Sequence, residues 1–137
     1  MSMNSVALTI GRFQAPDPTD PSRPALHAGH VALLRTVLDE GKRVIVLLRT
    51  GTYDEANPYT YDQRVAAFRK AFPDEYGWIS FNGMEFTYEL GKRLHCMPVP
   101  DTEDIFHGRN CPWAEKMRRV KLPDDIEAIS GTALREG

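Results

Sequence analysis

The sequence lacks the features that membrane proteins, exported proteins and general nucleic-acid binders depend on. Its longest apolar run, residues 44–48, is far too short to cross a bilayer. Seventeen Lys and Arg stand against 19 Asp and Glu, and the net charge of −2 offers no basic excess for a nucleic-acid backbone. Residues 1–5 show no charged leader before a long apolar stretch, so we expect no secretory signal. These absences favour a cytoplasmic protein that binds neither membrane nor nucleic acid.

Cysteine is equally scarce, with only Cys96 and Cys111 in the chain. The two could pair on number alone, but without an export signal two free thiols in a reducing cytosol are the better interpretation. Neither lies in a C-x-x-C pattern, and no Cys/His cluster has the spacing of a structural zinc site. We therefore predict no metal held by the protein itself.

The 137 residues suffice for one hydrophobic core and are too few for two ordinary ones, so we expect a single domain over 1–137. Apolar runs predict strands at 6–10, 44–48 and 78–81, and a further strand at 94–99. Helical spacing of apolar residues predicts helices after the first two runs, from about residue 30 to the end signal Gly41, and from the capping box of Thr60 and Gln63 to residue 72. Residues 82–94 fit either a helix or a hairpin, and residues 116–122 fit an extended segment.

This alternation of strand and helix predicts an α/β protein with a Rossmann-like, doubly wound parallel sheet. In such a sheet, ligands gather at the carboxyl ends of the strands. A proline-rich stretch, residues 15–26, interrupts the pattern after the first strand and is expected to be a loop.

The first group of chemically suggestive residues follows the first strand. Gly11-Arg12-Phe13-Gln14 leaves the strand, and His27-Ala28-Gly29-His30 opens the next helix. Backbone N–H groups and the dipole at a helix start favour a phosphate, and two imidazoles three residues apart there can both donate hydrogen bonds to a triphosphate. A single histidine near a helix start more often caps or packs, but the pair at this junction favours a functional site.

A second group lies near the end of the chain. Residues 129–135 contain two hydroxyls, Ser130 and Thr132, together with Gly131 and Arg135. These can hold the distal phosphates of a nucleotide through N–H, O–H and guanidinium donors. Taken alone, the stretch is only a capped helix start; together with the histidines it is harder to attribute to chance.

A third stretch, residues 57–64, begins the helix after the second strand. Pro58 and Thr60 have a clear structural role as helix-start residues. Arg64, one turn into the helix, is either a surface charge or a residue that faces the site.

Together these residues resemble the HxGH-type nucleotidyltransferase superfamily, which includes nicotinamide-mononucleotide adenylyltransferases, cytidylyltransferases and ATP sulfurylase. Residues 27–30 match HxGH, and residues 129–135 match ISxTxxR. Residues 11–14 resemble the GRFQ opening of the nicotinamide-mononucleotide adenylyltransferases, and residues 57–64 resemble their NPF(T/S)xxER stretch. The motifs occur in the expected order over nearly the whole chain.

The resemblance implies that an acceptor phosphate attacks the α-phosphorus of a nucleoside triphosphate in line, with pyrophosphate leaving. His27 and His30 would contact the triphosphate, while Ser130, Thr132 and Arg135 would hold its β- and γ-phosphates. The nucleotide site would further include Gly11, Arg12, Phe13, Gln14 and Gly29, with Mg²⁺ carried in by the triphosphate rather than held in a carboxylate cage.

ATP with nicotinamide mononucleotide as acceptor is the leading expectation. A cytidylyltransferase that uses CTP and a phosphorylated alcohol is the alternative, followed by ATP sulfurylase-like chemistry. A nucleotide-binding module without turnover is the alternative from a different class. The sequence itself carries no code for the acceptor, and a homo-oligomer is possible because small members of the superfamily often assemble.

Two departures from the family pattern stand out. The insertion at residues 15–26 lengthens the connection between Gln14 and His27, as a tolerated surface loop, as a lid or as a contact to a neighbouring subunit. The sequence stops two residues after Arg135, where relatives usually continue the helix.

Residues 104–109, followed by Trp113, resemble a YGR segment of phage and bacterial relatives, so Arg109 is either a substrate contact or a solvent-facing charge.

Overall fold

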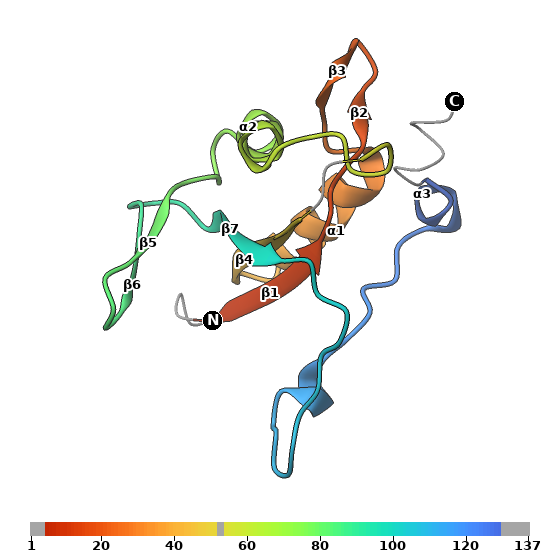
Figure 1. The fold of residues 1–137 in the computed structure, drawn as a ribbon. Helices are drawn as coiled ribbons and strands as arrows, with labels where there is room; N and C mark the ends of the chain where they lie inside the picture. The colour runs from red at the N-terminus through yellow and green to blue at the C-terminus, as the bar shows by residue number, and fades with distance from the viewer. Residues whose placement is uncertain (1–4, 52–53, 130–137) are drawn as a thin grey trace.

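The computed structural model describes residues 5–51 and 54–129 of the chain. Its centre is a parallel sheet of three strands in the order β1-β4-β7, formed by Val6–Gly11, Arg43–Thr50 and Leu94–Pro100 (Figure 1). Helix α1, Ala28–Leu38, connects β1 to β4, and helix α2, Tyr61–Ala71, follows β4. The predicted Rossmann-like α/β architecture with a parallel sheet is confirmed.

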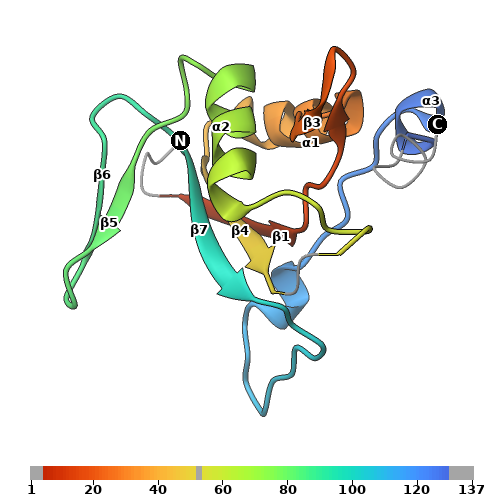
Figure 2. The ribbon, with the colours of Figure 1, turned by 45° about the horizontal axis from the view of Figure 1, so that its top comes forward.

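Both helices pack on the same face of this sheet, as Figure 2 shows. The strands lie side by side in chain order, so two right-handed crossovers bring α1 and α2 to one side. The core between the layers is apolar and comes from both helices and from alternate residues of β4 and β7: Leu34, Leu38, Phe68, Phe72, Val44, Val46, Leu48, Leu94 and Cys96. A doubly wound sheet also carries helices on its second face, and neither α1 nor α2 lies there.

The ends of both helices follow the local signals of the sequence. Gly41 has a φ of 84°, and its N–H bonds to the carbonyl of Leu38, which closes α1. Thr60 and Gln63 form the predicted reciprocal capping box at the start of α2. Local hydrogen bonding therefore sets where the helices begin and end.

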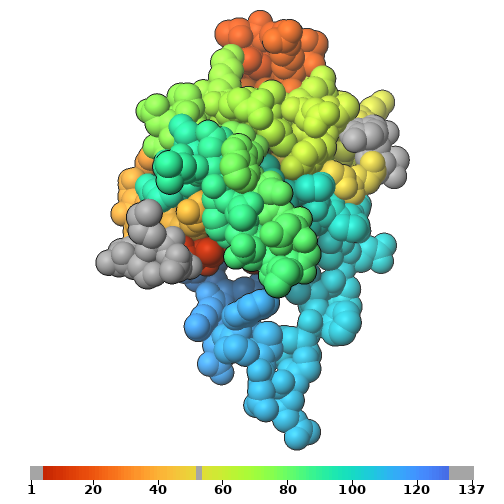
Figure 3. Space-filling view, turned by 90° about the vertical axis from the view of Figure 1, so that its left-hand side faces the viewer, coloured from red at the N-terminus to blue at the C-terminus, as the bar shows by residue number. Residues whose placement is uncertain are grey.

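The prediction of a parallel strand at residues 78–81 is wrong. Strand β5, Ile79–Phe81, pairs antiparallel with β6, Phe86–Tyr88, in a separate hairpin, and β7 is the third strand of the parallel sheet. The reason is the turn at Asn82-Gly83. Gly83 has a φ of 93°, and the Asn82 side chain accepts hydrogen bonds from the backbone N–H groups of Met84 and Glu85, which reverses the chain at once. The hairpin lies toward the viewer in Figure 3 (green).

The proline-rich insertion is also more ordered than the predicted loop. It contains a short antiparallel pair, β2 (Pro16–Asp17) and β3 (Asp20–Pro24). Pro16 and Pro24 face each other at the end of this pair, where a missing N–H costs little on short edge strands. The hairpin is tied to the start of α2, because the Tyr59 hydroxyl donates to the carbonyl of Pro21 at 2.9 Å.

After β7 the chain is mostly irregular up to α3, Asp124–Glu127, with one 3₁₀ turn, η1, at Ala114–Lys116. The extended segment predicted at 116–122 forms no strand. Arg118 instead pairs with Glu40, at the end of α1, through hydrogen bonds that hold the pKa of Glu40 well below its usual range. Cys96 and Cys111 are both free thiols, as predicted. Among the described residues, no helix combines the length and the apolar character that a bilayer crossing requires.

Candidate functional site

The two histidines of the H-x-G-H stretch meet at the start of α1. His27 is the N-cap, and its Nδ1 accepts hydrogen bonds from the backbone N–H groups of Gly29 at 3.0 Å and His30 at 3.2 Å. A ring nitrogen that accepts carries no proton, so the neutral ring bears its proton on Nε2. The rings of His27 and His30 stack with centroids 3.6 Å apart. His27 therefore shapes the helix start and keeps one N–H available as a donor.

Gly29 is required by this arrangement. A Cβ at that position would come within 2.8 Å of His27 Cε1 and 3.1 Å of His27 Nδ1. It would also lie 3.6 Å from the carbonyl oxygen of Ile126, in α3. Any side chain here would push the His27 ring away from the cap, so the glycine of H-x-G-H makes room for the first histidine and for the close approach of α3.

His30 is the more enclosed of the pair. Its ring lies between His27 and Phe13, whose centroid is 4.5 Å away. Burial, with a smaller contribution from His27, lowers the pKa of His30 to about 3, and burial also lowers the pKa of His27. Both rings are consequently neutral near pH 7. The buried Nδ1 of His30 finds no hydrogen-bond partner among the described residues, and such an atom is a costly feature that a bound ligand can relieve.

The Gly11–Gln14 turn supports this pair from the side of β1. Phe13 adopts a φ of 53° and lays its ring over Gly11, where a Cβ would lie 2.8 Å from Phe13 Cε2. The Gln14 amide is buried and bonds in both directions to the backbone of Tyr59, at 3.0 Å and 3.2 Å. Phe13 and Gln14 thus build the floor of the site and join it to α2, while Arg12 is exposed at its surface.

Next to this turn, at the carboxyl ends of β1 and β4, lies a small polar pocket, here called the arginine pocket. Its walls carry three guanidinium groups among eight residues: Arg12, Gln14, Arg49, Thr50, Gly51, Asn57, Arg64 and Asp101. Arg49 pairs with Asp101 and donates to the carbonyl of Thr102 at 3.0 Å. Its Nε is buried and finds no hydrogen-bond partner among the described residues. Three arginines against one carboxylate make this pocket suited to an anion.

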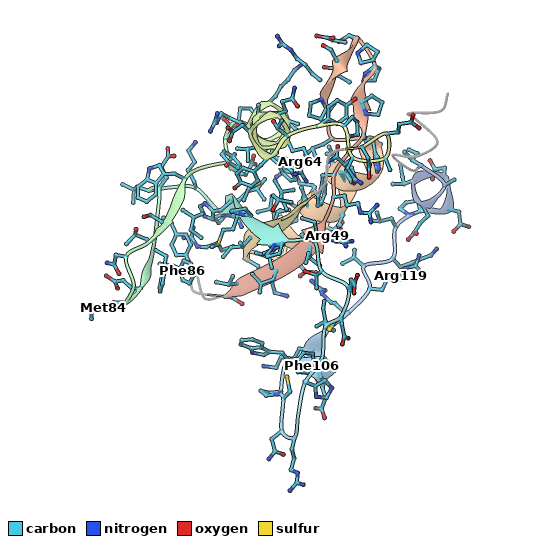
Figure 4. All side chains as sticks on the ribbon, viewed as in Figure 1. Arg49, Arg64, Met84, Phe86, Phe106 and Arg119 are labelled. Atoms are coloured by element: carbon cyan, nitrogen blue, oxygen red, sulfur yellow. The ribbon has the colours of Figure 1, made fainter. Side chains whose placement is uncertain are left out.

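Arg64 is buried, with only 1% of its surface exposed, so its interpretation as a surface charge is wrong. Its guanidinium donates to the carbonyls of Arg12 at 2.8 Å and Arg49 at 2.9 Å, and its Nε donates to Thr60. A long guanidinium can satisfy several carbonyls at once, whereas the same carbonyls would otherwise be left unpaired. Arg64 thereby ties the carboxyl ends of β1 and β4 to α2 (Figure 4).

The remaining predicted site residues fall into two groups. Ser130, Thr132 and Arg135 lie outside the described residues, although α3 brings Ile126 and the chain up to Ile129 beside the start of α1. Arg109 is exposed and does not line the arginine pocket.

The sequence reasoning missed the two residues that form the ion pair of the pocket, Arg49 and Asp101. Each stands at the carboxyl end of a strand, which is the signal that would have revealed them.

The fold and the site define an α/β protein with neutral histidines at a helix start and arginines at the neighbouring strand ends. The family model described as cytidylyltransferase-like matches residues 25–137. The chain belongs to the cytidylyltransferase-like family, and with it to the HxGH-type nucleotidyltransferases. No curated protein and no solved structure matches the chain. The matched region begins just before His27, so it does not include the Gly11–Gln14 turn.

Proposed function

We propose that this protein is a nucleotidyltransferase that moves AMP from ATP to a phosphorylated small molecule and releases pyrophosphate. The family suggests the transfer chemistry in general terms. The observation that carries the proposal is the stacked, neutral pair of His27 and His30 at the start of α1. Such a pair offers side-chain N–H donors to a triphosphate at the positive end of the helix dipole.

The histidines act by hydrogen bonding and positioning. His27 donates from Nε2, because its Nδ1 is occupied by the helix cap. His30, whose buried Nδ1 lacks a partner among the described residues, steadies the charge that develops at the α-phosphate. Ser130, Thr132 and Arg135 are proposed to hold the β- and γ-phosphates, on the strength of the ISxTxxR resemblance.

The arginine pocket is proposed to receive the acceptor's phosphate. Arg12 and Arg49 line it, and it adjoins the turn that supports the histidines. An acceptor held there would lie beside the triphosphate, and holding two reactants in line accounts for much of the rate enhancement in phosphoryl chemistry. In this scheme no side chain of the protein forms a covalent intermediate.

Mg²⁺ is proposed to arrive with the triphosphate. Among the described residues, no three His, Cys, Asp or Glu side chains group as a metal site, and the carboxylate of the arginine pocket, Asp101, already pairs with Arg49. These residues fit an ion held mainly by phosphate oxygens and water. When bound, the ion neutralises phosphate charge.

ATP is proposed over CTP because residues 11–14 resemble the GRFQ opening of the nicotinamide-mononucleotide adenylyltransferases, which also makes nicotinamide mononucleotide the first acceptor to test. CTP with a phosphorylated alcohol is the alternative. The two free thiols fit the reducing compartment in which such an enzyme would work.

The test is pyrophosphate release with Mg²⁺, with ATP or CTP offered against a panel of phosphorylated acceptors. We expect release with ATP, and we expect His30→Ala to lower the rate by about 10² to 10³, the usual cost of losing one preorganised donor. His107→Ala is the matched control, because His107 is exposed on an irregular segment and, among the described residues, its ring bonds to its neighbour Gly108. Pyrophosphate release with CTP and not with ATP would mean that CTP is the donor nucleotide. Triphosphate binding without turnover on any acceptor would favour a binding module, and an unchanged rate in His30→Ala would remove the role proposed for the histidines.

A further inference from the structure

The face of the sheet opposite α1 and α2 carries a row of exposed apolar side chains. Residues alternate across a strand, so Val6, Leu8 and Ile10 of β1 point away from the helical layer. They are 44%, 61% and 40% exposed. This row forms the floor of a surface that we call the apolar cradle.

The β5–β6 hairpin forms one wall of the cradle. Ile79 pairs with Tyr88 and Phe81 with Phe86, so all four side chains share one face of the hairpin. The Tyr88 ring packs against His95, with centroids 5.0 Å apart, and under Arg43, whose guanidinium carbon lies 3.8 Å from the ring centroid.

His95 and Arg43 lie on the same sheet face as the β1 row, so the apolar face of the hairpin continues the floor. Towards its turn the hairpin exposes Phe81 at 55%, Phe86 at 44% and Met84 at 92%.

The second wall is the segment 101–117, here called the arm. It projects beyond the sheet on the side away from the helices, as Figures 1 and 2 show. It exposes four large apolar side chains, Ile105, Phe106, Trp113 and Met117, at 69%, 86%, 74% and 74%. A pocket of about 340 Å³ lies between the base of the arm and the floor, where Ile10 and Ile105 line it together with Gly11, Arg49, Thr102, Glu103 and Asp104. Met84, Phe86 and Phe106 mark the two walls in Figure 4.

The exposed apolar side chains of the floor and the two walls add up to a large area. The ten cradle side chains named above, weighted by their exposed fractions, present on the order of 1,000 Å² if each offers roughly 150 to 250 Å² when fully exposed. The largest apolar patch of an ordinary monomer covers about 300 to 600 Å². A stable dimer buries about 800 Å² on each partner. The cradle therefore meets the area that a homodimer needs.

We propose that the apolar cradle binds a second copy of this chain, with the arm of each copy packed over the β1 floor of the other. The chain carries both an exposed apolar floor and a projecting apolar arm, so a two-fold axis can place the arm of each copy on the floor of the other. Because each copy has a net charge of only −2, the electrostatic repulsion between two copies is small. Because Leu8 is exposed in the single chain, a polar residue there costs the monomer little and the dimer much.

Sedimentation equilibrium of the full chain tests the proposal. We expect a mass of twice 15.5 kDa at concentrations of about 10 μM and above. Leu8→Glu and Phe106→Asp should each weaken association at least tenfold, while circular dichroism and the melting of the diluted protein stay unchanged. Leu90→Glu is the matched control and should remain dimeric, since Leu90 is 96% exposed but lies in the turn between β6 and β7. A monomer at all concentrations, or a dimer unaffected by both variants, overturns the proposal.

Tryptophan fluorescence gives a second measurement of association, and a folding defect would not produce the same dependence on concentration. Trp78 and Trp113 are the two tryptophans of the chain, so Trp78→Phe leaves Trp113 of the arm as the sole reporter. Dilution of this variant should move the Trp113 emission to longer wavelength and raise its quenching by iodide as the arm is released to water. Emission that stays solvent-exposed at every concentration, in a protein that sediments as a dimer, would mean that another surface forms the interface.

Discussion

Gly29→Ala separates the stability of α1 from the function of its histidines. The added Cβ would lie 2.8 Å from His27 Cε1, which is closer than real side chains approach, so the imidazole must turn away. Two hydrogen bonds to His27 Nδ1 and the stack on His30 are then lost. The substitution should therefore disable the site while leaving the fold in place.

The expected magnitudes follow from two opposing contributions. Loss of the N-cap costs about 1 kcal/mol. Replacement of glycine by alanine inside the first turn of a helix stabilises the helix by up to about 1 kcal/mol. We therefore expect the free energy of unfolding in urea to change by less than about 1 kcal/mol. Turnover should fall by about 10² or more, because a displaced donor is lost to the transition state.

Gly108→Ala is the control for this experiment, because a Cβ there meets nothing within 4 Å and both measurements should stay at the level of the unsubstituted protein. Full activity in Gly29→Ala would refute the role given to the His27 ring. A loss of stability above about 3 kcal/mol would show instead that the glycine serves packing, since that is the range of core disruption.

Three further outcomes are expected. Burial lowers the pKa of His30 to about 3 and lowers those of His27 and His95, so the folded state binds fewer protons than the unfolded state. The unfolding free energy should be constant above about pH 7.5 and should fall by about 2 kcal/mol by pH 5 through His30 alone. His30→Gln should flatten this pH dependence, measured by urea unfolding at each pH. Arg64→Met leaves the carbonyls of Arg12 and Arg49 without this donor and should lower the free energy of unfolding by about 3 to 5 kcal/mol. Arg64→Lys should lower it by a smaller amount, because lysine keeps the charge but not the fork of donors. A loss below about 1 kcal/mol in Arg64→Met would contradict the bracing role. Tyr59→Phe removes the hydrogen bond to the insertion hairpin and should lower the free energy of unfolding by about 1 kcal/mol. Proteolysis between β2 and β3 should become faster, and an unchanged cleavage rate would show that the bond does not hold the hairpin.

Local hydrogen bonding and apolar spacing made much of the fold predictable. The strands at β1 and β4 are apolar runs, and both helices carry their end signals within a few residues, as at Gly41 and Thr60. The position of the histidines at the start of α1 followed from the same local pattern. These features depend on neighbours in the chain, which is why a single sequence contains them.

The partner of each strand depended on distant contacts. The run at 78–81 has the composition of a parallel strand, but the Asn82-Gly83 turn pairs it with β6, and Tyr88 seats the hairpin on Arg43 and His95. The sequence alone left the choice between hairpin and helix open at 82–94, because apolar content does not distinguish the two.

The chemistry of the site divides in the same way. The sequence by itself indicated the part of the site that follows β1, because H-x-G-H and the turn after β1 are local motifs at the carboxyl end of a strand. Only the tertiary structure decided what each residue does. It buried Arg64 as a brace for two strand ends and put the Gln14 amide on the backbone of Tyr59. It also brought Arg49 of β4 to Asp101 after β7. Those roles depend on which carbonyls and charges long-range packing leaves within reach, and a pattern of neighbours along the chain does not contain that information.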